Sequence, residues 1–217
     1  MFMKNTVGIV WNYLDNNPCI KKDLERNLIN ARALAKHIIK TQKLNTTIDA
    51  VISAIRRYEL GRPDDQFQLA RKLIGRTVTL STRSGLAEIS LIKNDDVQRA
   101  LPVLFDIIDH NRGEIVRIIQ ATESIKLIVD EKNLDNIISV FPKNGISAVD
   151  KSLAEINMHM HPQMITTRGI LAVISNELTI NGINIVEIVS CLPEMLFFVK
   201  EEDILKAYQV LYQLCRN

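Results

Sequence analysis

The chain has 217 residues, 47% of them hydrophobic and 24% charged, with 27 Lys and Arg against 25 Asp and Glu. This composition is typical of a globular protein with two or three small domains, and the net charge of +2 leaves nucleic-acid binding to a local basic patch. No apolar run approaches the length that spans a bilayer, no signal-peptide pattern opens the chain, and three scattered cysteines form no disulfide framework. We therefore expect a cytoplasmic protein that does not enter a membrane.

The first part of the chain, residues 1–60, is expected to be a small all-α domain. Its apolar residues recur at the spacing of four short helices. Asn30 is placed to cap the third helix, over 31–41, and Thr46 or Thr47 to cap the fourth. A break with turn chemistry and a short connecting helix follow, so we place a connecting segment at 61–75.

The third and fourth helices and the short loop between them resemble a helix-turn-helix motif. Five basic residues would place positive charge around the fourth helix, as contact with phosphates requires: Lys36, Lys40, Lys43, Arg56 and Arg57. The same helices can instead form a dimerisation or docking bundle, because Lys and Arg are favourable at helix C-termini in any case. Both interpretations remain open at this point.

From Thr77 onward the chain repeats itself. Leu86-Ala87-Glu88-Ile89 returns as Leu153-Ala154-Glu155-Ile156, and beyond the next loop the two copies align at an offset of 70 positions. Each copy also has a lead-in strand, at 77–81 and 146–149. We therefore interpret 76–150 and 151–217 as two similar units.

The second copy has the clearest elements. They are a helix from Thr167 to Leu178, a strand from Ile183 to Val189, a turn at Cys191–Glu194, a buried strand at Met195–Val199 and a closing helix at 202–214. Because no fourth strand follows that helix, an edge of the second unit would lie open. We expect the lead-in strands to be exchanged, with 146–149 closing the first unit and 77–81 reaching across to close the second.

A set of residues in the second copy resembles an ACT domain, and more narrowly the ACT repeats of aspartate kinases. The set is Gly169-Ile170, Val173, Leu178, Gly182-Ile183-Asn184-Ile185, Ile188, Ser190, Glu194, Phe198-Val199 and Asp203. The resemblance implies an α+β fold of tandem ferredoxin-like βαββαβ units, here preceded by the helical domain. It also implies binding of a small molecule, usually an amino acid, with allosteric output and no catalysis.

In this family the effector contacts the loop before the first helix and the start of the second strand. On this sequence those positions are Met164, Ile165, Thr166, Thr167, Gly169, Ile170, Asn184 and Ile185. Gly169 would let the backbone of a helix N-terminus approach a carboxylate, and Asn184 would accept a hydrogen bond from an amino group. Alternatively, Gly169 only packs the helix on the sheet and Asn184 only ends a turn. In the first unit Arg99 and Glu114 stand at these two places, so we expect that unit to have lost the site.

The function predicted from the sequence is that of a non-catalytic regulator of amino-acid metabolism. Its ACT units would bind a small effector, expected to be an amino acid, and pass the signal to the helical domain, with DNA as a possible target. The alternative is a regulatory subunit that docks on a separate biosynthetic enzyme, such as one of the aspartate pathway. No catalytic motif or cofactor motif is evident. No metal site is evident either, since His159 and His161 lack a third ligand. We also expect a homodimer.

Overall fold

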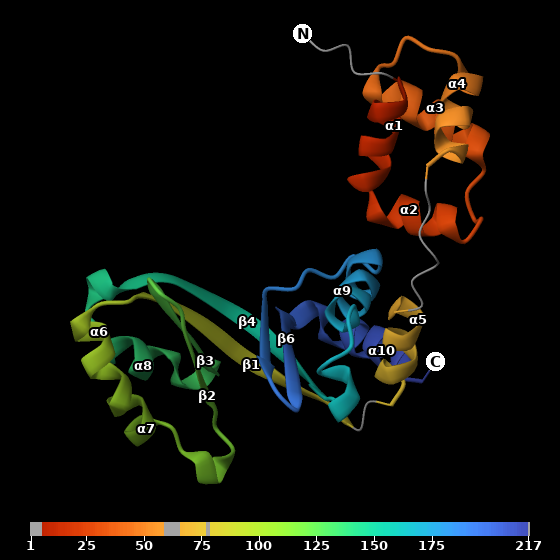
Figure 1. Cartoon of the computed structure of the whole chain (residues 1–217). Coiled ribbons are helices and arrows are strands. Elements are labelled where there is room, and N and C mark those ends of the chain that lie inside the picture. Colours follow the sequence, from red (N-terminus) through yellow and green to blue (C-terminus); the bar gives the residue numbers. More distant parts are fainter. Residues whose placement is uncertain (1–5, 59–65, 77–78, 217) are drawn as a thin grey trace. The chain divides into compact units, whose positions relative to one another are not determined.

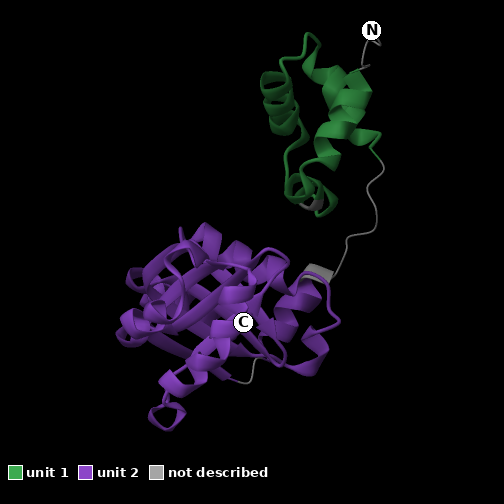
Figure 2. Cartoon of the chain, turned by 90° about the vertical axis from the view of Figure 1, so that its left-hand side faces the viewer, with its two compact units in different colours: residues 1–65 green, residues 66–217 purple. Residues whose placement is uncertain are grey.

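The computed structural model describes residues 6–58, 66–76 and 79–216. Contacts within the chain divide it into two compact units, Met1–Asp65 and Gln66–Asn217, which are coloured separately in Figure 2. None of the helices in the described part of the chain is long and apolar enough to cross a membrane.

The described residues of the first unit, 6–58, form four short helices. They are α1 (Thr6–Asp15), α2 (Pro18–Glu25), α3 (Ala31–Gln42) and α4 (Ile48–Arg56). The caps predicted at Asn30 and Thr47 are confirmed, because the Asn30 side chain accepts hydrogen bonds from the backbone of α3 and the Thr47 side chain accepts one from Ala50. The apolar faces of α1, α3 and α4 meet in a common core.

The second unit combines one antiparallel sheet with helices, as the α+β fold class predicted. In chain order it contains α5 (Gln66–Ile74), β1 (Thr79–Ile92), α6 (Asp95–Ala100), α7 (Leu104–Ile107), β2 (Val116–Gln120), β3 (Ser124–Asp130), α8 (Leu134–Val140), β4 (Ile146–His159), α9 (Ile170–Ile180), β5 (Glu187–Cys191), β6 (Glu194–Lys200) and α10 (Ile204–Leu214). The six strands lie in the order β2-β3-β1-β4-β6-β5 (Figure 1).

The long strands β1 and β4 join two ferredoxin-like halves into this single sheet. The first half contains β2, β3, the C-terminal part of β1 and the start of β4, and the second half contains β5, β6, the C-terminal part of β4 and the start of β1. The two halves have the same register, since Leu86 pairs with Asp130 in the first and Leu153 with Lys200 in the second. The tandem repeat predicted from the sequence is therefore confirmed.

The predicted strand exchange is also confirmed for the residues that the structure describes. Thr79, Leu80 and Ser81 pair with His159, Met158 and Asn157 of the second half, while residues 77 and 78 lie outside the described residues. The expectation of separate lead-in strands was wrong, because each lead-in is the first part of β1 or β4. Gly85 and Ser152 take a positive φ at the bends of these strands, where the pairing is irregular.

Each half has helices on one face of the sheet and its own apolar core. Helices α6, α7 and α8 cover the first half, and α9 and α10 cover the second. The opposite face carries a smaller core to which both halves contribute, formed by Leu86, Ile128, Leu153, Leu196 and Phe198. The sheet is therefore curled, so that β3 of one half and β5 of the other come within hydrogen-bonding distance.

Two predicted elements are placed differently in the structure. The strand expected at Ile183–Val189 is β5, which begins only at Glu187, because the chain first turns away from the end of α9. The helix expected within the connecting segment is α5, which belongs to the second unit. Its residues Ala70, Leu73 and Ile74 are buried in the same core as α9.

Candidate functional site

The loop of residues 160–169, between β4 and α9, is held in shape by its own hydrogen bonds. The backbone N–H of Met164 donates to the His161 carbonyl at 2.8 Å, and the Thr167 hydroxyl donates to the Gln163 carbonyl at 2.7 Å. The imidazole Nδ1 of His161 accepts from the Gln163 N–H at 3.2 Å. The loop therefore presents a fixed surface before α9 begins.

Gly169 is the last residue of this loop and the N-cap of α9. Its φ of 87° lies in the left-handed region, which strains any residue with a Cβ. A Cβ built there would lie 4.0 Å from the Cβ of Ala70 on α5. Backbone conformation is therefore sufficient to explain the glycine, independently of any ligand.

The N-terminus of α9 lacks a side-chain cap. Its first backbone N–H groups have no acceptor within the helix, and the helix dipole makes this end positive. An anion placed here would satisfy these donors.

A pocket of about 230 Å³ lies beside this helix end, and we call it the β5-side pocket. Its lining residues are Met160, Met164, Ile165, Thr167, Gly169, Ile170, Leu171, Ser190, Leu192 and Met195. Ile165, Leu171 and Leu192 remain 44–51% exposed. The pocket thus combines an apolar wall with the donors of a helix end, which suits a small ligand that has one carboxylate and an apolar side chain.

The structure brings together five of the eight positions predicted for the effector. Met164, Ile165, Thr167, Gly169 and Ile170 all line the β5-side pocket. Thr166 instead lines a hollow on the opposite side of the loop, next to α5, which Thr167 also contacts.

Asn184 and Ile185 lie elsewhere, in a third hollow with Thr179 and Gly182. This hollow follows the C-terminal end of α9, whereas Gly169 precedes its N-terminal end. A helix of 11 residues is about 16 Å long, which is more than an amino acid spans. One such ligand therefore cannot contact Gly169 and Asn184 of the same chain.

The first half has no comparable loop. Only Lys93 and Asn94 separate β1 from α6, and the Asn94 side chain accepts a hydrogen bond from the Val97 N–H at 2.9 Å. Asp95 and Asp96 occupy the first turn of α6. This helix end is closed by a cap and two carboxylates, so it repels an anion instead of binding one.

The equivalence of Arg99 with Gly169 was wrong. Arg99 lies in the last turn of α6, and Asn94 is the N-cap that corresponds to Gly169. The sequence alignment slipped because the loop before α6 is much shorter than the loop before α9.

Glu114, the counterpart of Asn184, has a structural role in the first half. Its carboxylate accepts from Lys132 Nζ at 2.7 Å, from the Asn133 side chain at 2.8 Å and from the Asp109 N–H at 3.0 Å. These hydrogen bonds, with that of Lys132 the strongest, lower the pKa of Glu114 to about 2. The carboxylate therefore stays ionised and fixes the segment before β2.

The five basic residues predicted to meet nucleic acid are all exposed on the first unit. They are Lys36, Lys40, Lys43, Arg56 and Arg57, and none of them forms a salt bridge with a described residue. Residues 6–58 contain nine Lys and Arg against four Asp and Glu. In the described part of the chain, no group of three or more His, Cys, Asp or Glu is arranged to hold a metal ion.

Lys72 on α5 and Arg76, two residues after the end of that helix, are the part of this region that the sequence did not indicate. They stand beside the loop at Gln163 and Thr166, almost ninety positions away in the sequence. No motif marks these two residues, and a spacing of four positions at the end of a helix is a weak local signal.

Comparison with known proteins gives a match at the level of structure only. No protein-family model matches the chain, and neither does any curated protein. The regulatory subunit of aspartate kinase from Thermus flavus superposes with a TM-score of 0.52 at 15% identity, and the ligand-free one from Thermus thermophilus with 0.51 at 16%. Each match covers 64% of this chain and 97% of the subunit.

The aspartate kinase from Clostridium acetobutylicum gives a TM-score of 0.53 at 18% identity, with 64% of this chain matched. The match covers 34% of that enzyme, so this chain spans about a third of the kinase but nearly the whole of the regulatory subunits. Likeness at such low identity is evidence for the fold alone. The chain shares the fold of the regulatory, ACT-type domains of aspartate kinases.

Proposed function

We propose that this chain is a non-catalytic regulator of amino-acid metabolism, and that its second half binds an amino acid at the N-terminus of α9. The observation that carries the proposal is the contrast between the two halves. The end of α9 is uncapped and opens beside the β5-side pocket, whereas Asn94, Asp95 and Asp96 close the equivalent end of α6. The similarity of the fold to aspartate kinase regulatory subunits supports this function.

The expected mode of binding follows from the chemistry of the pocket. The ligand carboxylate would accept hydrogen bonds from the first N–H groups of α9. An apolar side chain would lie against Met164, Ile165 and Leu192, which line the wall of the pocket. Among the residues that line the pocket there is no carboxylate to pair with the ligand's amino group.

A second copy of the chain can supply the missing polar contact. Strand β5 is at an edge of the sheet, so it is free to pair with the β5 of a second copy around a two-fold axis. In such an antiparallel pair, residues before the start of β5 in one copy lie beside the end of β5 in the other. Asn184 and Ile185 of the second copy would then approach Leu192, at the mouth of the β5-side pocket. The complete site would therefore require a homodimer.

The first experiment is a thermal-shift screen of the twenty amino acids against the full chain. A ligand that binds only the folded state raises the melting temperature, by an amount that grows with the logarithm of the ratio of its concentration to its Kd. We expect an amino acid with an apolar side chain to give the largest shift. If none of the twenty raises the melting temperature at millimolar concentration, the proposed function is wrong.

A mixing experiment then tests whether two copies build the site. Chains carrying Gly169→Asp and chains carrying Asn184→Ala should each lose binding on their own. After brief unfolding and joint refolding, hybrid dimers contain one site in which both residues are intact, so calorimetry should detect restored binding. The same mixture would still fail to bind the amino acid if the two residues acted within one chain or if the protein were a monomer.

The helical unit is proposed to bind nucleic acid as the output of the regulator. The exposed basic residues of α3 and α4 support this target, as does the excess of positive charge in residues 6–58. If the helical unit docked on an enzyme, we would expect an exposed apolar patch on it. Among the described residues of this unit, only Trp11 and Leu28 are exposed large hydrophobic residues. The alternative of a regulatory subunit for a separate biosynthetic enzyme is therefore less well supported.

Salt dependence of binding tests this part of the proposal. A DNA-binding unit should lose affinity steeply as the salt concentration rises. Replacing Arg56 and Arg57 by Gln should reduce the slope of log affinity against log salt concentration by about one for each phosphate that is no longer neutralised. Replacing Lys21 by Gln, on α2, is the matched control and should leave the slope nearly unchanged. Equal slopes for all variants would contradict a role of α4.

A further inference from the structure

Helix α5 is fixed on the second half by one of its faces. Ala70, Leu73 and Ile74 are buried against α9 and the loop before it. Arg71 forms a salt bridge with Glu177 of α9, which locks the rotation of α5 about its axis. Leu69 and Lys72 on the neighbouring face are therefore presented in a fixed direction, and Arg76 follows in the turn directly after α5.

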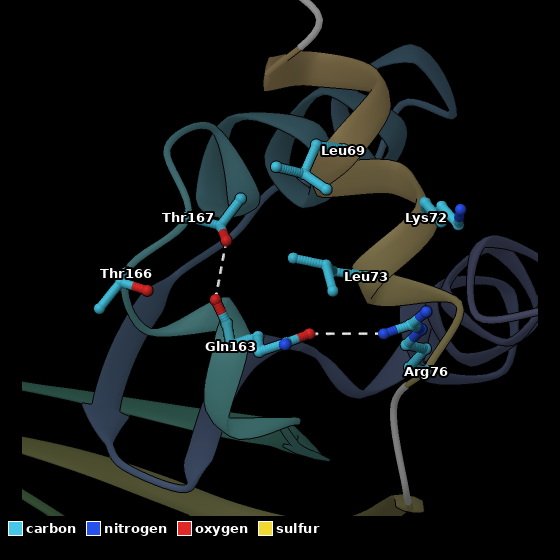
Figure 3. Close-up of a pocket in the computed structure, with 7 residues that line it drawn as sticks. All are labelled: Leu69, Lys72, Leu73, Arg76, Gln163, Thr166 and Thr167. Atoms are coloured by element: carbon cyan, nitrogen blue, oxygen red, sulfur yellow. Dashed lines mark hydrogen bonds between the residues drawn. The ribbon is translucent and has the colours of Figure 1, made fainter.

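This face forms a pocket together with the loop before α9, and we call it the α5 pocket. Its lining residues are Leu69, Lys72, Leu73, Arg76, Gln163, Thr166 and Thr167 (Figure 3). Its volume of about 330 Å³ is at the lower end of the range for small-molecule sites. Figure 3 shows Leu69 and Leu73 pointing from α5 toward the loop, which gives the pocket an apolar floor.

The α5 pocket carries two positive charges and no negative charge. Neither Lys72 nor Arg76 forms a salt bridge with a described residue, and no Asp or Glu lines the pocket. Among the described residues, the Arg76 guanidinium has its polar contact with the Gln163 side-chain oxygen alone, where Nη1 donates at 3.4 Å. Arg71, on the same helix, differs because Glu177 neutralises it.

The hydrogen-bond donors in the pocket are also free. A contact of 3.4 Å is weak, so most of the donors of Arg76 remain available, and an arginine fork matches a planar or tetrahedral anion at two points. The Thr166 hydroxyl has no hydrogen-bond partner among the described residues, whereas the Thr167 hydroxyl already donates to Gln163. Two cations, one free hydroxyl and a leucine floor are complementary to a compact anion of charge −2 that carries a short aliphatic group.

We propose that the α5 pocket is a binding site for a small organic dianion, distinct from the amino-acid site at the N-terminus of α9. A phosphate monoester and a dicarboxylate share this chemistry. Either would bridge Lys72 on α5, and Arg76 in the turn after it, to Thr166 on the loop, and so hold helix and loop together. Thr167 lines both pockets, which places the dianion site on the other side of the loop that contributes to the amino-acid site. The proposal does not depend on the amino-acid site being occupied.

The test is calorimetry on the full chain with inorganic phosphate and, separately, with succinate, at constant ionic strength. We expect one site per chain for at least one of the two probes, and the better probe identifies the source of the dianion. Arg76→Gln should weaken binding by about tenfold or more, because it removes a charge-assisted hydrogen bond. Lys72→Gln should weaken it as well, by less, since Lys acts as a point charge.

Matched controls separate this site from general attraction of anions. Lys206→Gln changes an exposed lysine on α10 that lines neither pocket, and it should leave binding unchanged. Gly169→Asp should weaken binding less than Arg76→Gln does, because Gly169 lines the β5-side pocket and not the α5 pocket. The proposal is wrong if neither probe binds the parent chain, or if Lys206→Gln weakens binding as much as Arg76→Gln does. It is also wrong if Gly169→Asp, and not Arg76→Gln, abolishes binding of the dianion, because the anion would then occupy the end of α9.

Discussion

Arg83 on β1 and Asp150 on β4 occupy equivalent places in the two halves of the sheet and carry opposite charges. Arg83 Nη1 lies 3.1 Å from Oδ1 of Asp130, at the end of β3, and Asp150 is paired with Lys200, at the end of β6. Since Asp130 and Lys200 are also equivalent by register, one ion pair is the charge-reversed copy of the other. The halves therefore have the same fold but are not interchangeable.

A second equivalent pair of sites lies between the strands that face each other across the curled sheet. Arg117 on β2 contacts Glu155 on β4, with Nε 2.6 Å from Oε2 and Nη2 2.8 Å from Oε1. At the equivalent site Glu187 on β5 faces Glu88 on β1, and Lys126 on β3 lies between them, 2.6 Å from the first carboxylate and 3.1 Å from the second. Both sites join the two halves, but one uses a direct ion pair and the other uses a cation shared by two acids.

The first prediction concerns Arg117. Its partner Glu155 is only 4% exposed, so Arg117→Met would leave a buried carboxylate without its cation. We expect a loss of about 3–5 kcal/mol in the free energy of unfolding, measured in urea. Arg117→Met combined with Glu155→Met should recover most of this loss, because the buried charge is then absent. If Arg117→Met alone were as stable as the parent chain, the ion pair with Glu155 would not stabilise the fold.

The second prediction transfers the arrangement of the Arg117 site to the equivalent Lys126 site. Burial alone lowers the pKa of Lys126, but its hydrogen bonds with Glu187 and Glu88 outweigh burial and raise the pKa above its usual value. Lys126→Leu should therefore destabilise the chain by leaving the two carboxylates facing each other. Adding Glu187→Arg should restore stability, because the equivalent positions of the other site hold Arg117, Glu155 and, in place of Lys126, a leucine, Leu196. Urea denaturation of the single and double variants gives the comparison. No recovery in the double variant would show that the two halves differ in geometry as well as in charge.

The third prediction is a pH dependence at Glu114. The pKa of this carboxyl is lowered to about 2 in the folded chain, below its ordinary value near 4.5. A group with a lowered folded pKa stabilises the fold above its unfolded pKa, and this stabilisation is lost as the pH falls from about 4.5 toward 2. Glu114→Gln should therefore lower the melting temperature at pH 7, and the difference from the parent should shrink over that acidic range. A difference that stays constant from pH 7 to pH 2 would refute the assignment.

The fourth prediction concerns Ser152, at the bend of β4. Its φ of 54° is in the left-handed region, and the equivalent bend of β1 has Gly85 with a φ of 72°. Ser152→Gly relieves a strain of about 1–2 kcal/mol and adds about 0.5–1 kcal/mol of chain entropy to the unfolded state. We expect a net gain of roughly 0.5 kcal/mol. The hydrogen bond from the Ser152 N–H to Glu131 is kept because it uses the backbone. The reciprocal Gly85→Ser should be destabilising, and a melting curve for each variant decides the matter.

The sequence predicted the fold well because buried strands constrain residue type along their whole length. Leu86-Ala87-Glu88-Ile89 and its copy at 153–156 lie at the centre of the sheet, where both faces carry apolar cores and few alternatives fit. Loops carry no such constraint, and the short connection before α6 led to the wrong counterpart for Gly169. The irregular turn before Glu187 likewise displaced the start of β5.

The candidate site was only partly predictable, since it depends on contacts between distant segments. The resemblance to ACT domains was enough to predict a shared pocket for five residues of one contiguous segment, Met164, Ile165, Thr167, Gly169 and Ile170, whereas Thr166 lines the α5 pocket. Asn184 was assigned to the same ligand because the family pattern gives no distance along α9. Arg76 was missed because its position beside Gln163 results from the packing of α5 on α9, which no local pattern reports.

The central claim is that a carboxylate binds at the N-terminus of α9, and Gly169 provides the most direct measurement. Gly169→Asp and Gly169→Asn place side chains of the same shape at this position, and both residue types tolerate a positive φ better than others. They differ in charge and in the amide donors of Asn. Calorimetry with the best amino acid from the screen should show Gly169→Asp binding at least about tenfold more weakly than Gly169→Asn, because its carboxylate repels that of the ligand. Equal affinities of the two variants would contradict a carboxylate at this helix end.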